Sequence, residues 1–136
     1  MVYADITLIN AGDMELAKRH MIDRDEVKQM NVRMLADSGA YMMAINEGIQ
    51  EQLRLSFVEK RKLTMADGTV REFDVLGPLM VKFSNRTATC NALLLEGDNE
   101  PLLGVIPMEE MDVIIHPQRQ ELVVHPDHPD YALLRL

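Results

Sequence analysis

The sequence contains no tryptophan, only 4% aromatic residues and a single cysteine, Cys90. One cysteine excludes an internal disulfide framework and is typical of proteins in reducing compartments. Lysine and arginine number 14 against 22 aspartates and glutamates, and the net charge of -8 argues against a nucleic-acid surface. No apolar run approaches the roughly 20 residues of a membrane-spanning helix, and no secretory leader pattern opens the chain. We therefore expect an acidic cytoplasmic protein without a membrane or nucleic-acid partner.

What the chain does contain is a series of short, alternating apolar runs separated by turn residues. Its 136 residues suffice for one domain, and 11 methionines help the aliphatic residues to fill a core. Side chains that alternate along a strand point to opposite faces of a sheet, so the alternating runs predict strands. The runs are Val2–Leu8, Val32–Ala36, Leu79–Phe83, Ala88–Leu94 and a closing pair, Val113–Ile115 with Leu122–Val124.

Helices are expected to be few and short. Asn46 is a candidate N-cap for a short helix, and Pro107 fits the first turn of another. The charged stretch 12–26 is interpreted as an irregular connection that contains one helical turn. We therefore predict an all-β domain with one or two short helices over residues 1–124, followed by a proline-rich tail over residues 125–136.

A hairpin is predicted around Ala66-Asp67-Gly68-Thr69. The flanking strands are Phe57–Met65 and Val70–Leu76, and Asp-Gly is a preferred dipeptide of tight hairpin turns. Gly77-Pro78 is expected to break the chain again after the second strand.

The candidate site is Asp37-Ser38-Gly39-Ala40, where an apolar strand runs into a turn. The carboxylate of Asp37 can polarise a water molecule as a general base. The hydroxyl of Ser38 can brace neighbouring backbone, and Gly39 lets backbone N–H groups come close to the carboxylate because it has no Cβ. An ordinary Asp-initiated turn has the same sequence, so both interpretations stay open for the motif alone.

The motifs taken in order resemble the retropepsin-like (clan AA) aspartic proteases, including the bacterial members built on one retroviral-protease-like unit. The matching segments are Met34-Leu35-Ala36, Asp37-Ser38-Gly39-Ala40, Tyr41–Ile45, the hairpin around Asp67-Gly68, and Leu102-Leu103-Gly104 before Pro107–Met111. The resemblance implies a closed β-barrel or sandwich that acts as a homodimer, an aspartic endopeptidase without metal or cofactor. It implies that Asp37 is catalytic and that Ser38, Gly39, Ala40, Leu103 and Gly104 support the site. It also implies that Ala66, Asp67, Gly68 and Thr69 form a flap over a peptide or protein substrate.

The chain carries only one Asp-Ser-Gly, so one protomer supplies only one candidate catalytic carboxylate of this kind. Hydrolysis of this type needs two carboxyl groups that share a proton around one water molecule. A chain with one such aspartate must obtain the second from a copy of itself, so we expect a twofold homodimer with both Asp37 side chains at the axis.

Two other interpretations stay open. Ser38 stands where the single-domain enzymes usually have threonine, Tyr41 is bulky, and the hairpin tip is short and acidic. These differences favour a catalytically weak or inactive dimer of the same fold that binds peptides or serves as an interaction module. An unrelated small barrel is the third possibility.

A metal site is not expected at the His125–Asp130 segment, because its alternating prolines predict an extended, solvated chain.

Overall fold

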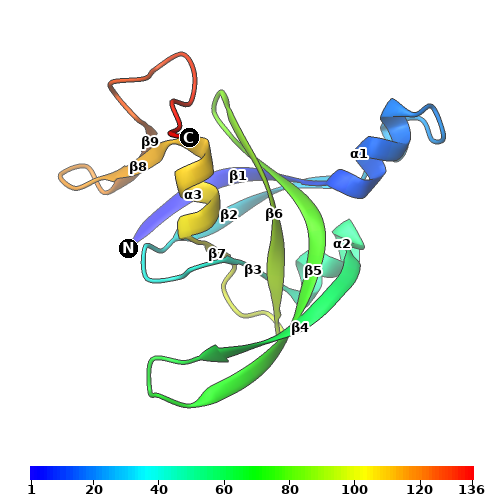
Figure 1. The fold of residues 1–136 in the computed structure, drawn as a ribbon, viewed down its shortest axis with the longest axis horizontal. Helices are drawn as coiled ribbons and strands as arrows, with labels where there is room; N and C mark the ends of the chain where they lie inside the picture. Colours follow the sequence, from blue (N-terminus) through cyan, green and yellow to red (C-terminus); the bar gives the residue numbers. More distant parts are fainter.

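Seven of the nine strands form one sheet that closes on itself in the computed structural model, which describes residues 1–136 (Figure 1). The strand order is β1-β2-β7-β3-β6-β5-β4, and an additional pairing of β1 with β5 closes the barrel and leaves β4 outside it. The remaining two strands, β8 and β9, pair only with each other. The strands are β1 (Val2–Asn10), β2 (Gln29–Ala36), β3 (Met43–Asn46), β4 (Ser56–Thr64), β5 (Val70–Phe83), β6 (Arg86–Leu95), β7 (Leu102–Leu103), β8 (Val113–His116) and β9 (Glu121–Val124).

The core fills the inside of this barrel. Val2, Ala4, Ile6 and Leu8 of β1 are all buried, as their alternation predicts. They belong to a cluster of 21 buried apolar residues that includes Met34, Met43 and Met111, each fully buried. Unbranched methionine adapts to irregular gaps, which explains how a core with so few aromatic residues is filled. The protein is thus mostly β-sheet and forms a single domain, in agreement with the sequence.

Three short helices accompany the sheet, one more than the upper limit expected from the sequence. They are α1 (Ala11–Lys18), α2 (Glu47–Leu53) and α3 (Val105–Met111). The predicted cap of α2 is confirmed, because the Asn46 side chain accepts a hydrogen bond from the Ile49 amide at 3.0 Å. None of the three helices has the length and apolar character that crossing a membrane requires.

The prediction of an irregular connection over residues 12–26 was wrong for α1. The helix is charged and only weakly amphipathic, and Ala17 is its one buried residue, so no apolar periodicity marks it. Its start depends on Asn10, whose side chain accepts a hydrogen bond from Asp13 N at 3.0 Å. The same side chain donates to the Leu53 carbonyl at 2.9 Å. Buried Asn10 therefore connects β1, α1 and the end of α2.

The predicted break at Gly77-Pro78 is also wrong, because β5 runs through it. The first half of β5 pairs with β4, and its second half, from Leu79, pairs with β1. The register against β6 shifts between Leu76 and Leu79, so Pro78 lies outside the regular ladder, where its missing N–H is tolerated. One continuous strand therefore contributes to both the barrel and the projecting hairpin (Figure 1).

The segment after β9 exposes Pro126, Asp127, Pro129 and Asp130, and it is also bound to the rest of the protein at several points. The carboxylate of Asp112 contacts His128 Nδ1 at 2.7 Å and accepts a hydrogen bond from the Leu133 amide at 3.0 Å. The Leu133 hydrogen bond is the main cause of the lowered pKa of Asp112. The Asn85 side chain donates to the Pro129 carbonyl at 3.0 Å, and buried Arg86 donates to that of His128.

We predict that Asn10→Ala lowers the free energy of unfolding by about 3 kcal/mol, because the Leu53 carbonyl and the Asp13 amide lose their partner. Asn46→Ala is the matched control, since Asn46 also caps a helix and donates to a distant carbonyl, that of Asn99 at 3.0 Å. That second hydrogen bond is exposed, so water can replace it, and the variant should cost about 1 kcal/mol. Urea denaturation followed by circular dichroism measures both variants. Equal losses in the two variants would contradict the connecting role of Asn10.

Candidate active site

The turn after β2 presents the carboxylate of Asp37. Strand β2 ends at Ala36, and the Asp37 amide donates to the Leu103 carbonyl at 3.0 Å. The Oδ1 atom of Asp37 accepts a hydrogen bond from the Gly39 amide at 2.8 Å, and the Ala40 amide donates to the Asp37 carbonyl at 3.1 Å. Asp37 is half-buried. The turn therefore orients one carboxylate oxygen toward its own backbone, as an Asp-initiated turn does.

A short strand from late in the sequence supports this turn. Strand β7 lies between β2 and β3, parallel to β2 and antiparallel to β3. Directly after it, the Val105 amide donates to the Ala40 carbonyl at 2.8 Å, and the Ile106 amide donates to the Tyr41 carbonyl at 3.1 Å. Fully buried Leu103 lies under the turn. The backbone on both sides of the Asp37 turn is thus hydrogen-bonded to residues 103–106.

Gly104 allows this close approach. A Cβ at this position would lie 2.7 Å from the Met42 carbonyl carbon and 2.9 Å from the Ala40 carbonyl oxygen. Both distances are shorter than van der Waals contact, and both neighbours are backbone atoms that no side-chain rotation can move. Any other residue at 104 would therefore push the Asp37 turn away from β7.

A mostly apolar cleft with a volume of about 340 Å³ opens beside Asp37. Asp37 is the only acidic residue among the 14 that line it. Gly39 and Ala40 also line the cleft, whereas Ser38 faces a different hollow, against α3 and β8. The other lining residues are Tyr41, Met42, Ala44, Leu63, Thr64, Met65, Ala66, Phe73, Leu93, Leu95 and Leu102.

The predicted hairpin forms one wall of this cleft. Its tip is closed by two hydrogen bonds, from Gly68 N to the Met65 carbonyl at 2.9 Å and from Met65 N to the Thr69 carbonyl at 2.7 Å. Gly68 has a φ of +86°, which glycine adopts without strain. A hydrogen bond from the Thr69 hydroxyl lowers the pKa of Asp67. Of the four predicted flap residues, Ala66 lines the cleft, and Asp67, Gly68 and Thr69 form the exposed tip.

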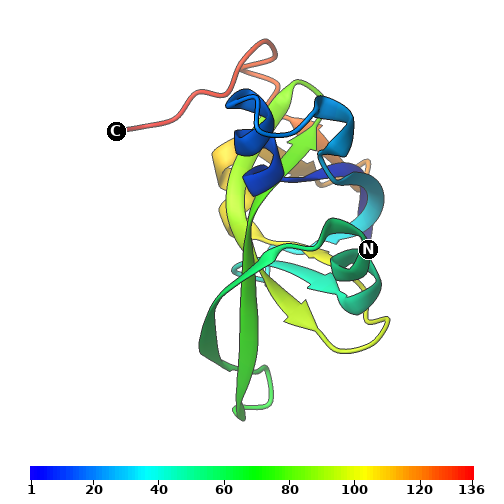
Figure 2. The same cartoon turned by 90° about the vertical axis from the view of Figure 1, so that its right-hand side faces the viewer.

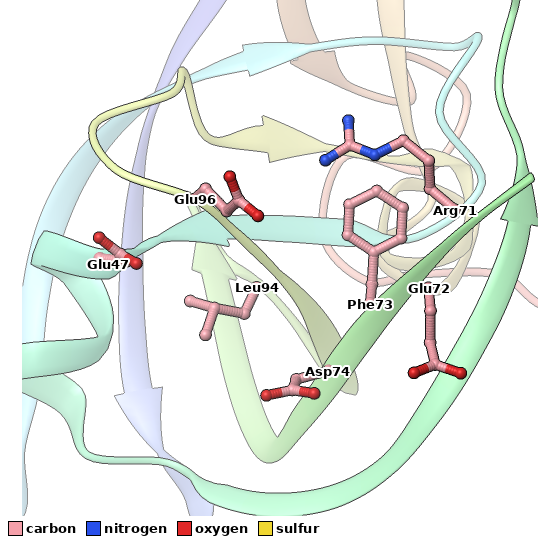
Figure 3. Close-up of a pocket in the computed structure, with 7 residues that line it drawn as sticks. All are labelled: Glu47, Arg71, Glu72, Phe73, Asp74, Leu94 and Glu96. Atoms are coloured by element: carbon pink, nitrogen blue, oxygen red, sulfur yellow. The ribbon is translucent and has the colours of Figure 1, made fainter. Parts of the chain in front are cut away.

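A second hollow, of about 180 Å³, adjoins the cleft at Phe73 and is strongly acidic (Figure 3). The Arg71 guanidinium carbon lies 5.2 Å from the centre of the Phe73 ring. Lys60 is within 3.2 Å of Asp74 and neutralises part of the negative charge. The carboxylates around the hollow are Glu47, Glu72, Asp74 and Glu96.

The sequence prediction missed the apolar walls of the cleft. Leu63, Met65 and Phe73 alternate along the two hairpin strands, and this alternation was the available signal. Alternation indicates which face of a hairpin is apolar, but it does not indicate that this face lines the same cleft as Asp37. Leu93 and Leu95 likewise belong to a strand whose neighbours only the sheet order reveals.

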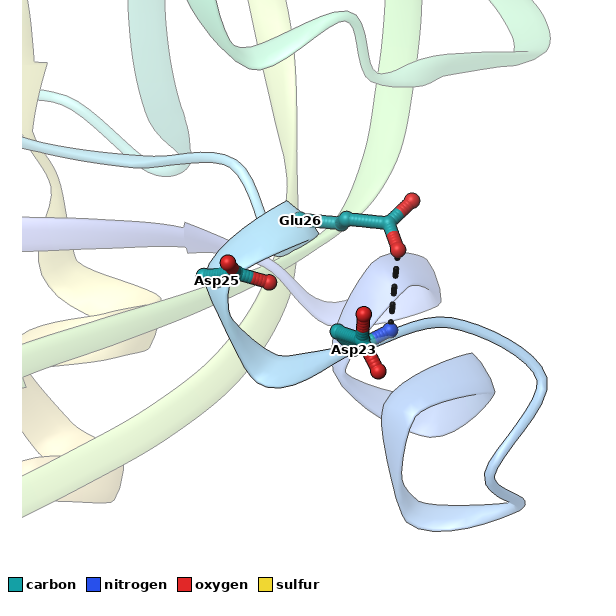
Figure 4. Close-up of side chains that lie close together, drawn as sticks. All are labelled: Asp23, Asp25 and Glu26. Atoms are coloured by element: carbon teal, nitrogen blue, oxygen red, sulfur yellow. Dashed lines mark hydrogen bonds between the residues drawn. The ribbon is translucent and has the colours of Figure 1, made fainter.

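Two groups of side chains that can bind metal ions lie outside the cleft. Asp23, Asp25 and Glu26 bring carboxylate oxygens within 4.8 Å of one another, but all three are exposed and none lines the cleft (Figure 4). Glu26 accepts a hydrogen bond from Asp23 N at 3.1 Å and so caps a 3₁₀ turn. In the tail, the rings of His125 and His128 stack with centroids 4.5 Å apart, and their Nδ1 atoms are both hydrogen-bonded.

Neither a scan against protein-family models nor a search of curated proteins finds a match for this chain. We therefore interpret the site from its own geometry.

Gly104→Ala is predicted to lower the free energy of unfolding by about 3 kcal/mol, because its Cβ overlaps backbone at Ala40 and Met42. In the control Gly48→Ala, the new Cβ meets only Asn46 Oδ1 at 3.6 Å, and the variant should gain about 0.5 kcal/mol from helix propensity. Chemical denaturation measures both. If Gly104→Ala left the free energy of unfolding unchanged, residues 40–42 and Gly104 could move apart without cost, which would contradict the close contact.

The thiol of Cys90 is predicted to be unreactive in the folded protein. Burial, with a smaller contribution from Glu110, raises the pKa of Cys90 to about 12, and only the thiolate is nucleophilic. Labelling with a disulfide reagent at pH 8 should be at least about 100-fold slower in the native protein than in urea. Equal rates would mean that Cys90 is accessible and ionised.

Proposed function

We propose that the protein is a homodimeric aspartic endopeptidase of retropepsin-like fold. The observation that carries this proposal is the apolar cleft in which Asp37 is the only acidic side chain, beneath a hairpin. The cleft suits an extended peptide with apolar side chains. Strand β4 is at the outer edge of the sheet order, and a peptide can bind an unpaired strand edge through main-chain hydrogen bonds.

The chemistry requires two copies of Asp37. Two carboxyl groups close together cannot both ionise, so the pair holds one proton. The ionised carboxylate accepts a proton from water as the water oxygen attacks the peptide carbonyl carbon, and the protonated partner donates its proton to the carbonyl oxygen. When the tetrahedral intermediate collapses, the C–N bond breaks and the amine leaves with the proton that the first carboxyl took from water. The other carboxylate takes the proton of a hydroxyl group as the carbonyl re-forms, so the pair again holds one proton.

The supporting structure explains how Asp37 could be held for this role. The Gly39 amide donates a hydrogen bond to Oδ1 of the Asp37 carboxylate at 2.8 Å. Backbone hydrogen bonds with residues 103–106 fix the position of the turn. Pre-organised groups lose little freedom when the transition state forms. Ser38, next to Asp37 in the same turn, lines a second hollow with residues of α3 and β8.

One observation favours the second candidate function, a dimer that binds peptides without cleaving them. Tyr41 lines the cleft next to the motif and keeps 64% of its surface exposed, so its ring can take up space beside the scissile bond. A statine-type transition-state mimic distinguishes the two functions. A carboxyl pair that shares a proton should bind the tetrahedral analogue far more tightly than the matching peptide, and a passive cleft should not.

Asp37→Asn is predicted to lower kcat/KM on a peptide library by at least about 1000-fold, because the amide cannot accept the proton of the attacking water. The dimer mass should be unchanged in sedimentation equilibrium. Asp98→Asn, which alters an exposed loop carboxylate outside the cleft, is the matched control and should retain activity. Full cleavage by Asp37→Asn would exclude the proposed mechanism.

A further inference from the structure

Residues 131–136, which we name the C-terminal arm, carry apolar side chains that are largely exposed in the protomer. Tyr131, Leu133, Leu134 and Leu136 each expose more than half of their surface. Figure 2 shows the end of the chain leaving the body of the protein. Apolar side chains grouped in this way are typical of an interaction surface.

Hydrogen bonds attach the beginning of the arm to the rest of the protomer. Its Leu133 amide is bound to the Asp112 carboxylate at 3.0 Å, and the preceding residues are bound by Asn85, by Arg86 and by Asp112 through His128. Asp112 lies between the end of α3 and the start of β8. These contacts reduce the entropy that the arm loses when it binds a partner.

An uncovered apolar hollow of about 440 Å³ lies next to this fastening point. It is formed by α3 and β8, and we name it the α3–β8 hollow. One of its lining residues is Ser38, the neighbour of Asp37 in the candidate site. The others are Val105, Met108, Glu109, Val113, Ile114 and Ile115.

We propose that the C-terminal arm of each protomer docks into the α3–β8 hollow of a second copy of this chain. This inference rests on the proposed function, since two Asp37 side chains can meet only if the turn around Ser38 faces the partner. The hollow beside Ser38 then faces the partner too. The leucines of the arm do not fill the hollow of their own protomer, because they are exposed, although the arm begins at its rim.

Charge complementarity favours the same occupant. Arg135 is the only charged side chain of the arm, and Glu109 is the only charged side chain that lines the hollow. Both are exposed in the protomer. In a twofold dimer each contact occurs twice, so the Arg135–Glu109 pair would form at both ends of the interface.

Mixing two charge-reversed variants tests whether the contact is made between subunits. Arg135→Glu and Glu109→Arg each place like charges at both contacts of their own homodimer, whereas the mixed dimer has opposite charges at both. After equimolar mixing, the dimer populations measured by native mass spectrometry should give the mixed dimer a dissociation constant about 10-fold lower than that of either homodimer. A mixed fraction at or below the statistical share of about one half overturns the proposed pairing.

The apolar part of the contact is tested by Leu133→Ser/Leu134→Ser and by a chain that ends at Asp130. Both should raise the dimer dissociation constant by about 100-fold or more, because the double variant removes four leucines per dimer from the contact and the shortened chain removes six leucines and two tyrosines. The control Leu16→Ser/Met21→Ser removes exposed apolar side chains near α1 and should leave the constant unchanged.

The outcomes separate this inference from the proposed function. A shortened chain that stays dimeric and still cleaves peptide overturns the docking of the arm and leaves the function intact. If Asp37→Asn cleaves normally while the shortened chain becomes monomeric, the function fails and the docking stands. A wild-type protein that is monomeric at high concentration overturns both.

Discussion

The close contact between Gly104 and the backbone of Ala40–Met42 is the constraint on which the rest of the site depends. It lets β7 lie between β2 and β3, so that one short strand joins two segments that precede it by about 60 residues in the chain. The hydrogen bonds that Asp37, Val105 and Ile106 donate follow from this position. The carboxylate is thereby placed by backbone rather than by flexible side chains, and backbone in a packed interior has few alternative positions.

The turn that presents Asp37 has two different sides. Gly39 and Ala40 face the apolar cleft, and Ser38 faces the hollow between α3 and β8. Three consecutive residues of one turn therefore contribute to two different hollows. On our proposal, substrate binding and association are linked through one turn, because a displacement of that turn changes both surfaces.

A single carboxylate in an apolar cleft is chemically incomplete for the proposed reaction. It can accept a proton, but no second acidic group in the cleft can donate one. Association would supply that group and would also bring two like charges together, a cost that a shared proton removes. The fold thus provides the positioning of the carboxylate, and the dimer would provide the acid–base pair.

Much of the fold was predictable from the sequence, because alternation and capping are local signals. The buried face of β1, the cap at Asn46 and the hairpin around Asp67-Gly68 were all predicted from neighbouring residues. Helix α1 was missed because its cap, Asn10, is secured by the carbonyl of Leu53, which lies 43 residues away. The continuity of β5 was missed because it depends on partners on both sides of the strand.

The same distinction applies to the site. The place where a carboxylate enters a turn can be read from residues 34–40 alone, because the strand, Asp37 and Gly39 are neighbours in the chain. Three relations follow only from the folded chain: β7 supports this turn, Leu63 and Phe73 line the same cleft as Asp37, and Ser38 lines a different hollow. These relations depend on which strands pair across long separations, and strand order is set by the packing of the whole barrel rather than by local propensity.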